Sequence, residues 1–272
     1  MNEEQITEGV KKQATWWLKE RLKKLQDERH DSMEVNPFMA PLVAALHGNK
    51  NFTDLADFLI GGHFSIGHAT GFGKLVDEKI LPNVFGTIKL DKKNRRGNIF
   101  EEPCFDNIDH VVHRRNGDAL LSLKASKWTI QLGQAVELNS SFNTIRTLLN
   151  DGHHHYQEIV MGVFYGTEDR LTDKYRLVRG ISTGANHDVY DLRNYVKVLA
   201  GQRFWAWLGE NEETQQWVMQ GILNAINENQ HQLNESQDLM EEYKNSFVRR
   251  YSHHIAKNGT VDWSSVLRGI NG

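Results

Sequence analysis

Cysteine is almost absent from this 272-residue chain, and long apolar runs and an excess of positive charge are missing as well. The single cysteine, Cys104, excludes an intrachain disulfide framework and a cysteine-rich zinc site, and we expect it to be a small buried side chain. No segment approaches the roughly 18 consecutive apolar residues that span a bilayer. The net charge of -3 excludes the overall basicity of a histone-like protein, so any contact with nucleic acid must be local.

What is present is ordinary globular composition. Hydrophobic residues make up 39% of the chain and charged residues 25%, which predicts a folded protein with a sizeable core. The N-terminus, MNEEQITEGVKK, lacks the basic segment followed by an apolar stretch that marks a secretory signal. We therefore expect a cytoplasmic protein.

The two ends of the chain show helical patterns. Amphipathic spacing predicts a helix over residues 13–29. A second helix is predicted to begin at a cap, Asn51 or Thr53, and to end at the glycine pair 61–62. The glycine-rich stretch 67–74, GHATGFGK, is interpreted as a loop.

The middle of the chain indicates an α/β core with a mixed β-sheet flanked by helices. A short helix is predicted to stop at Pro82, and an Asn-Gly-Asp signal predicts a hairpin turn. We expect a single domain, with a helical extension over about 1–65, a core over about 66–210 and C-terminal helices over about 211–272. The predicted core elements are strands 108–114 and 119–125, a helix over 128–149, and strands 158–166, 174–181 and 195–201.

Two residues of opposite charge flank the predicted hairpin turn. Asp109 lies in the first strand and Lys124 in the second, so antiparallel pairing brings both to one edge of the sheet. A lysine rarely lies in an apolar strand without a partner or a task. A carboxylate that holds Mg²⁺ on a phosphate, beside a lysine that polarises the attacking water, suits phosphodiester hydrolysis. The backbone carbonyl of Leu123 is expected to be a further metal ligand.

Asp109, a hairpin and the tripeptide 122–124 before a helix resemble the core of the PD-(D/E)XK nucleases. Further stretches in fixed order resemble the type II restriction endonuclease family of the EcoO type, which cuts RGGNCCY sites. The resemblance runs over nearly the whole chain. It implies a restriction-endonuclease-like fold, Mg²⁺ as cofactor, and action on double-stranded DNA as a homodimer. The stretches that carry it are NPFMAPLV, GHATGFGKLVDEKILP, CFDNIDHVV, LLSLKASKWTIQL, MGVFYG, LTDKYRLVRGISTGANHDV and the closing ING.

One position departs from that family's pattern. Ser122 stands where the family has an aspartate or glutamate, and a serine hydroxyl is a poor metal ligand. Two acids are candidates to replace the missing carboxylate. Glu78 follows the glycine-rich stretch and is slightly preferred, and Glu137 lies on the helix after Lys124.

Basic side chains near the core are candidate DNA contacts. Lys174, Arg176, Arg179, Asn186 and His187, in a predicted strand and loop, are suited to reading base edges in the major groove. The alternative is that they form the solvated face of an edge strand.

A second basic group is a candidate clamp on the DNA backbone, with a solvated loop as the alternative. Lys127 either contacts a phosphate or extends to solvent from the start of a helix. The members of the basic group are Lys89, Lys92, Lys93, Arg95 and Arg96.

These observations predict a Mg²⁺-dependent, site-specific DNA endonuclease that acts as a homodimer. The resemblance implies that its site is a GC-rich palindrome with a degenerate or unspecified centre. Two alternatives remain. One is a repair or recombination nuclease of the same fold that selects DNA structure. The other is a DNA-binding protein with a dead nuclease centre, which Ser122 favours.

Overall fold

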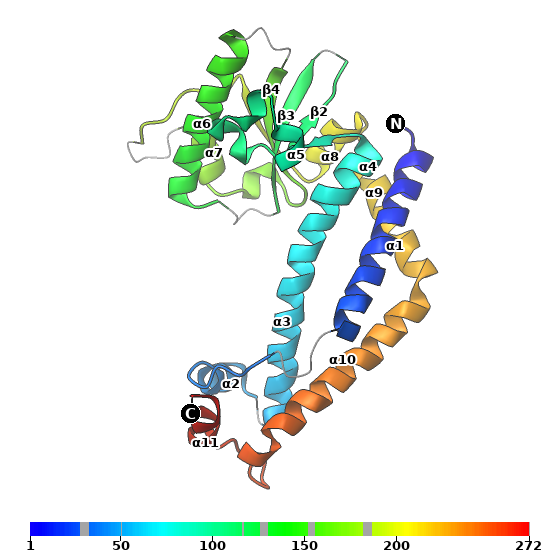
Figure 1. Ribbon diagram of the computed structural model, residues 1–272, viewed down its shortest axis with the longest axis vertical. Helices are drawn as coiled ribbons and strands as arrows, with labels where there is room; N and C mark the ends of the chain where they lie inside the picture. Colours follow the sequence, from blue (N-terminus) through cyan, green and yellow to red (C-terminus); the bar gives the residue numbers. More distant parts are fainter. Residues whose placement is uncertain are drawn as a thin grey trace. The chain divides into compact units, whose positions relative to one another are not determined.

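The computed structural model describes residues 1–27, 33–49, 51–115, 117–125, 130–151, 156–181 and 187–271 (Figure 1). These residues form two compact units, and each unit is built from two separated segments. The sheet unit consists of Met1–Ala14 and Gly73–Ala225. The helical unit consists of Thr15–Phe72 and Ile226–Gly272.

The described helices and strands follow one another as helices, a sheet region and helices again. The five strands are β1 (Ile88–Lys89), β2 (His110–Val112), β3 (Asp118–Lys124), β4 (Tyr156–Val163) and β5 (Val196–Ala200). The longer helices are α1 (Glu3–Asp27), α2 (Ala40–His47), α3 (Phe52–Leu75), α6 (Leu132–Asp151), α8 (Gln202–Gly209), α9 (Thr214–Glu228), α10 (Gln230–Tyr251) and α11 (Trp263–Asn271). The shorter helical segments are a π-helical turn at Val76–Ile80, α4 (Leu81–Phe85), α5 (Lys92–Arg95) and α7 (Lys174–Val178), with 3₁₀ turns at Ile99–Glu101, Pro103–Asn107, Glu168–Arg170 and Ser252–His254.

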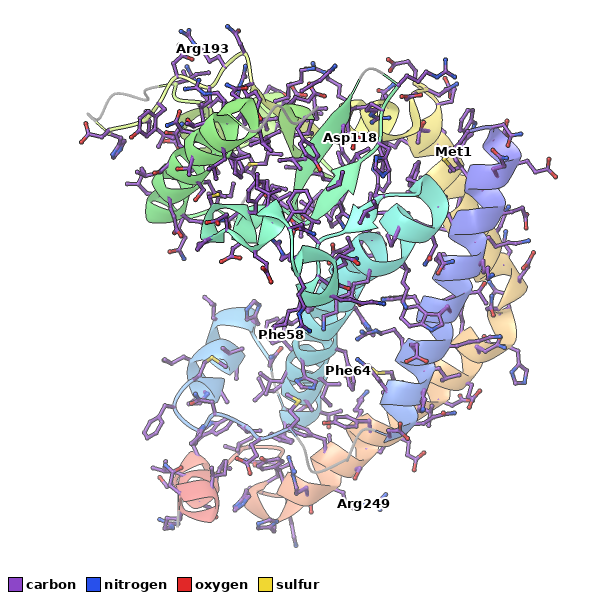
Figure 2. The ribbon with its side chains drawn as sticks, turned by 45° about the horizontal axis from the view of Figure 1, so that its top comes forward. Met1, Phe58, Phe64, Asp118, Arg193 and Arg249 are labelled. Carbon is purple, nitrogen blue, oxygen red and sulfur yellow. The ribbon has the colours of Figure 1, made fainter. Side chains whose placement is uncertain are left out.

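The sheet is mixed, and its strands lie in the order β1-β2-β3-β4-β5. The pairs β1–β2 and β2–β3 are antiparallel, whereas β3–β4 and β4–β5 are parallel. Asp118, labelled in Figure 2, begins β3, and α6 connects β3 to β4. The expected α/β class, a mixed sheet flanked by helices, is therefore confirmed.

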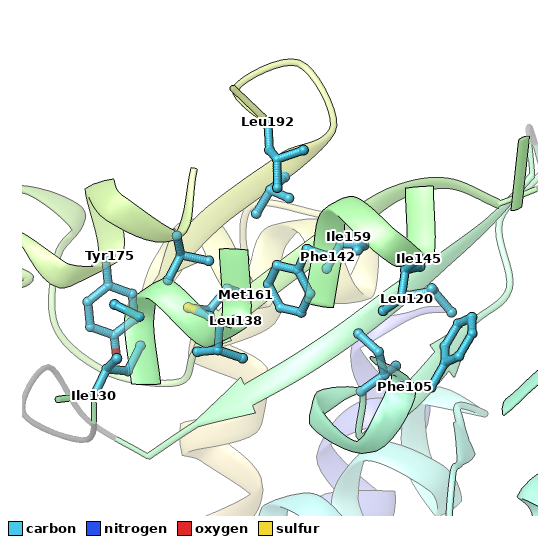
Figure 3. Packing of buried hydrophobic residues seen from close by; sticks show 14 of the residues in the cluster. Phe105, Leu120, Ile130, Leu138, Phe142, Ile145, Ile159, Met161, Tyr175 and Leu192 are labelled. Carbon is cyan, nitrogen blue, oxygen red and sulfur yellow. The ribbon is translucent and has the colours of Figure 1, made fainter. Parts of the chain in front are cut away.

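The core of the sheet unit lies between α6 and one face of the sheet (Figure 3). Leu138, Phe142 and Ile145 recur at helical spacing along α6 and are fully buried. They pack with Leu120 of β3 and Ile159 of β4, which are also fully buried. Each such side chain contributes about 1.5–3 kcal/mol relative to an exposed one, so this layer holds β3 in place.

The helical unit has its own aromatic core. The rings of Phe52 and Phe247 stack with centroids 5.9 Å apart and planes 8° apart. Tyr251 packs against both rings, and its hydroxyl accepts a hydrogen bond of 3.1 Å from the Val35 amide. Tyr243 is buried in the same cluster, so α3 and α10 are joined by aromatic packing.

The course of α3 corrects two expectations. The helix begins where the sequence predicts, because Asn51 Oδ1 accepts the Asp54 amide hydrogen at 2.9 Å. It does not end at the glycine pair 61–62, and residues 67–74 are helical and not a loop. Glycine costs a helix up to about 1 kcal/mol per residue relative to alanine. The buried Leu55 and Ile60 anchor the helix in the helical unit, and this packing outweighs the propensity.

Two further elements differ from expectation. The helix does not stop at Pro82, which is the second residue of α4 and follows directly on the π-helical turn at Val76–Ile80; α4 ends at Phe85, with Gly86 as its cap. The predicted strand 174–181 is instead the short helix α7. Tyr175 and Leu177 alternate with polar residues as in a strand. Val178 is also buried, so three side chains of one helical turn face the core, which strict strand alternation does not allow.

The division into units also differs from the expected layout of one domain with two helical extensions. Residues 1–14 belong to the sheet unit, and residues 66–72 belong to the helical unit.

Cys104 is half-buried where a fully buried side chain was expected, and its burial raises the pKa of its thiol.

Candidate functional site

The pairing of β2 with β3 places Asp109 beside Ser122. His110 lies opposite Leu121, so continuing the register by one residue sets Asp109 opposite Ser122. The Asp109 amide donates to the Leu121 carbonyl at 2.8 Å, which extends the ladder to this point. Side chains alternate along a strand, so Asp109, Ser122 and Lys124 lie on one face of the sheet. The structure therefore brings together the acid and the lysine that the hairpin predicts.

The polar atoms of this site are held closely. The Leu123 amide donates to Asp109 Oδ2 at 2.6 Å, which fixes one carboxylate oxygen against the end of β3. Lys124 Nζ donates to Ser122 Oγ at 3.3 Å. Ser122 is fully buried, so its hydroxyl is a shielded partner for the lysine. The other Asp109 oxygen has no described hydrogen bond.

Burial changes the proton affinity of both charged groups. Burial raises the pKa of Asp109, although the Leu123 amide and the charge of Lys124 oppose this change. Burial also lowers the pKa of Lys124, which Asp109 opposes. Groups whose pKa is displaced by burial and a specific partner are common at functional sites. Burial thus brings the proton affinities of Asp109 and Lys124 closer together than those of the free side chains.

A second polar network lies beside this pair. The imidazole of His110 is fully buried between Thr87 Oγ1, 2.9 Å from Nδ1, and Asp77 Oδ1, 2.8 Å from Nε2. Lys89 Nζ donates to the other oxygen of Asp77. The charge of Asp77 also raises the pKa of Asp109.

The structure distinguishes the acids near the pair. Glu78, the preferred candidate from the sequence, is exposed and lies 3.9 Å from Lys89 Nζ. Its neighbour Asp77 is held by His110 and influences Asp109. Glu137 is exposed on α6, and it is not among the described charged groups that shift the pKa of Asp109. Sequence reasoning missed Asp77 and His110, and the only signal was the acid pair Asp77-Glu78 after an apolar stretch.

This site offers few protein ligands for a metal ion. Among the described residues, no group of three histidine, cysteine, aspartate or glutamate side chains is arranged to hold a metal ion. Mg²⁺ is often bound by one or two carboxylates together with waters and substrate phosphates. Asp109, with one oxygen not engaged by Leu123, and the nearby carbonyl of Leu123 fit such a site if the substrate completes it.

The basic group around α5 divides into two kinds of side chain. Lys92, Lys93 and Arg96 are exposed. Arg95 is not a free cation, because its guanidinium donates to four backbone carbonyls at 2.6–3.2 Å. These hydrogen bonds hold the loop over residues 90–108 in place. We therefore remove Arg95 from the candidate contacts to the DNA backbone. Lys89 is likewise engaged, by Asp77.

The candidate base-reading residues do not lie on a strand. Lys174 and Arg176 belong to α7, and Lys174 Nζ pairs with Asp173 at 2.6 Å. Arg176 is exposed, while Arg179 follows the helix and donates to the Arg193 carbonyl at 3.4 Å.

Three further residues are candidate DNA contacts. His187 is half-buried. Lys127 and Asn186 lie outside the described residues.

Comparison with protein-family models and with curated proteins found no match to this chain. None of the helices in the described part of the chain is both long enough and apolar enough to cross a membrane.

Proposed function

We propose that this protein is a Mg²⁺-dependent endonuclease for double-stranded DNA, of the type II restriction class and the PD-(D/E)XK superfamily. The observation that carries the proposal is the half-buried pair of Asp109 and Lys124 on one face of the sheet, next to the Leu123 amide. Partial burial displaces the pKa of both groups, and such displaced groups are common where their charge is used.

The proposed chemistry assigns a role to each of these groups. Asp109 and the Leu123 carbonyl would hold Mg²⁺, which when bound supplies positive charge to the scissile phosphate. Lys124 would orient the attacking water and stabilise the negative charge that develops on the phosphate. Ser122 holds the ammonium group of Lys124 in place. Asp77, which His110 and Lys89 hold in place and whose charge raises the pKa of Asp109, is our candidate to supply the carboxylate that Ser122 lacks.

The basic residues outside the pair support binding of a polyanion. Lys92, Lys93 and Arg96 are exposed around α5 and would contact phosphates, which position DNA without reading its sequence. Arg176 on α7 is exposed and remains a candidate for base contacts, together with Lys174, Arg179 and His187.

The cleavage experiment uses supercoiled plasmid DNA and Mg²⁺. Discrete, reproducible fragments are expected, and sequencing their ends would give the site and the overhang. Asp109→Ala and Lys124→Ala are each expected to abolish cutting while a gel-shift assay shows retained DNA binding. Glu212→Gln, at an exposed acid outside all the candidate sites, is the control and should cut like the natural chain. Full activity in either alanine variant would show that the reaction centre lies elsewhere.

One observation favours a second candidate, a DNA-binding protein with an inactive centre. Ser122 is fully buried and its hydroxyl accepts a hydrogen bond from Lys124, so this position supplies no carboxylate to a metal ion. Specific DNA binding without cleavage by the natural chain would support this candidate. Cleavage of junctions or flaps in preference to linear duplex would instead support a repair nuclease.

We further propose that the protein acts as a homodimer through the helical unit. Phe38, Leu42 and Leu46 recur every four residues and leave 68, 71 and 81% of their surface exposed. The segment 36–47 that carries them contains no charged residue apart from the titratable His47, so two copies can meet without like-charge repulsion. A two-fold dimer also matches a palindromic DNA site.

A further inference from the structure

A pocket in the helical unit lies outside the site described above. Its volume is about 410 Å³, within the range of about 300–1,000 Å³ for small-molecule sites. Three helices contribute to it, and Phe64 on α3, labelled in Figure 2, is part of its wall. The lining residues are Arg21, Lys24, Leu25, His63, Phe64, Ile66, Gly67, His68, Ser236 and Met240.

The polar lining of the pocket has one sign of charge. Arg21 and Lys24 come from α1, burial and the charge of Arg21 lower the pKa of His68 on α3, and no carboxylate is among the described residues that line the pocket. Within the described part of the chain, no ion pair with a carboxylate is seen for Arg21 or Lys24. Cations that line a concave surface without acidic partners attract an anionic group.

Arg21 is fixed in position before any ligand binds. Its Nη1 donates to the Gly67 carbonyl at 3.1 Å, and its guanidinium lies over the Trp17 ring, 5.6 Å from the centroid. Gly71 makes room for it, because a Cβ atom there would lie 2.2 Å from Arg21 Nη2. The buried Nε of Arg21 has no hydrogen-bond partner among the described residues. A guanidinium held this way loses little entropy when it binds an anion.

The remaining lining is apolar. Leu25, Phe64 and Met240 form part of the wall, and the Phe64 ring stacks near His68 with centroids 6.3 Å apart. Ile66 leaves 72% of its surface exposed. Burial of such side chains against a ligand is favourable at about 25 cal/mol per Å² of apolar surface. The pocket thus offers cations and an apolar wall together.

We propose that this pocket binds a small amphiphilic anion. A phosphate, sulfonate or carboxylate group meets Arg21 and Lys24, and an apolar body lies against Leu25, Phe64 and Met240. This binding is independent of the proposed nuclease chemistry, because all of these residues belong to the helical unit.

The experiment compares two fluorescent probes on the full chain. One is 8-anilinonaphthalene-1-sulfonate, an aromatic anion, and the other is its uncharged relative N-phenyl-1-naphthylamine. In a chain carrying both Arg21→Gln and Lys24→Gln, the Kd of the anionic probe is expected to rise about tenfold or more, as the loss of charge-assisted hydrogen bonds predicts. The Kd of the neutral probe is expected to change by less than about twofold, since the apolar wall is intact.

Two control variants locate the binding. Lys244→Gln removes a cation of α10 that pairs with Asp57 outside the pocket, and it should leave both Kd values unchanged. Leu42→Ser with Leu46→Ser removes exposed apolar surface on α2 and should also leave them unchanged. Circular dichroism of each variant checks its fold.

Three results would overturn the proposal. The first is an unchanged Kd for the anionic probe in the Arg21 and Lys24 variant. The second is loss of probe binding in the Leu42 and Leu46 variant. The third is displacement of the anionic probe by a short DNA duplex, which would assign these cations to a DNA contact.

Discussion

Arg95 and Arg96 are adjacent arginines in one basic stretch, yet the fold uses them differently. The Arg95 guanidinium binds the carbonyls of Leu90, Phe100, Phe105 and Ile108. The side chain of Arg96 is exposed. Residue type and spacing cannot separate the two, because the carbonyls that bind Arg95 converge only in the folded loop.

Arg95→Ala is expected to lower the free energy of unfolding by about 2–4 kcal/mol, because it leaves four carbonyls without their donor. Arg96→Ala is expected to change stability by less than about 0.5 kcal/mol and to weaken DNA binding. Urea denaturation and a gel-shift titration measure the two effects. If Arg95→Ala were as stable as the natural chain, the loop would not depend on its guanidinium.

Asp77 and Asp109 are expected to affect stability in opposite directions as pH changes. Burial raises the pKa of Asp77, but hydrogen bonds from His110 and Lys89 outweigh it and leave that pKa below 3.8. The stabilisation from Asp77 is therefore complete above pH 3.8 and is lost as pH falls through its folded pKa. Burial raises the pKa of Asp109 above 3.8, so its ionisation costs stability as pH rises through that range.

Asp77→Asn should therefore destabilise the protein at neutral pH, and Asp109→Asn should stabilise it. Both differences should shrink toward zero in acid, where the two carboxyls are protonated in either state. Chemical denaturation of the two variants between neutral and acidic pH measures this. Destabilisation by Asp109→Asn at neutral pH would mean that its carboxylate is structural.

At the scale of elements, the hairpin is the part that the sequence predicts best. Alternation and the Asn-Gly turn place Asp109 and Lys124 on paired strands, and the structure has them on one face. The sequence favours Glu78 as the additional acid, whereas in the structure its neighbour Asp77 is held by His110 and Lys89. Asp77 and Glu78 lie in a π-helical turn, where the usual helical spacing no longer tells which side chain faces the sheet.

The errors in α3 and α7 have a different origin. Glycine weakens a helix locally, and alternating apolar residues favour a strand locally. In both segments the packing of buried side chains determines the secondary structure, and that packing involves residues far away in the chain. Local rules therefore predicted the sheet strands better than these helices.

The glycines of α3 give a test at this scale. A Cβ atom at Gly61 meets nothing within 4 Å, so Gly61→Ala should raise the unfolding free energy by about 0.5–1 kcal/mol. A Cβ atom at Gly71 lies 2.2 Å from Arg21, so Gly71→Ala must displace the guanidinium and should not stabilise. Thermal unfolding compares the two, and equal stabilisation would show that Arg21 does not pack on Gly71.

At the scale of the whole molecule, self-association should depend on α2. Leu42→Glu with Leu46→Glu places two carboxylates on the exposed apolar face and should convert the proposed dimer to a monomer. Sedimentation velocity measures this change. Leu223→Glu on α9, also at an exposed leucine, is the control and should remain dimeric. A monomeric natural chain would remove the basis for this interface.

The interleaved course of the chain has a consequence for inheritance. Each unit is assembled from one early and one late segment, and the boundaries fall inside α1, α3 and the region of α9. A single genetic crossover therefore cannot transfer either unit whole to another gene. We therefore expect the two units to have evolved together within one gene, and not to have been exchanged between genes as separate domains.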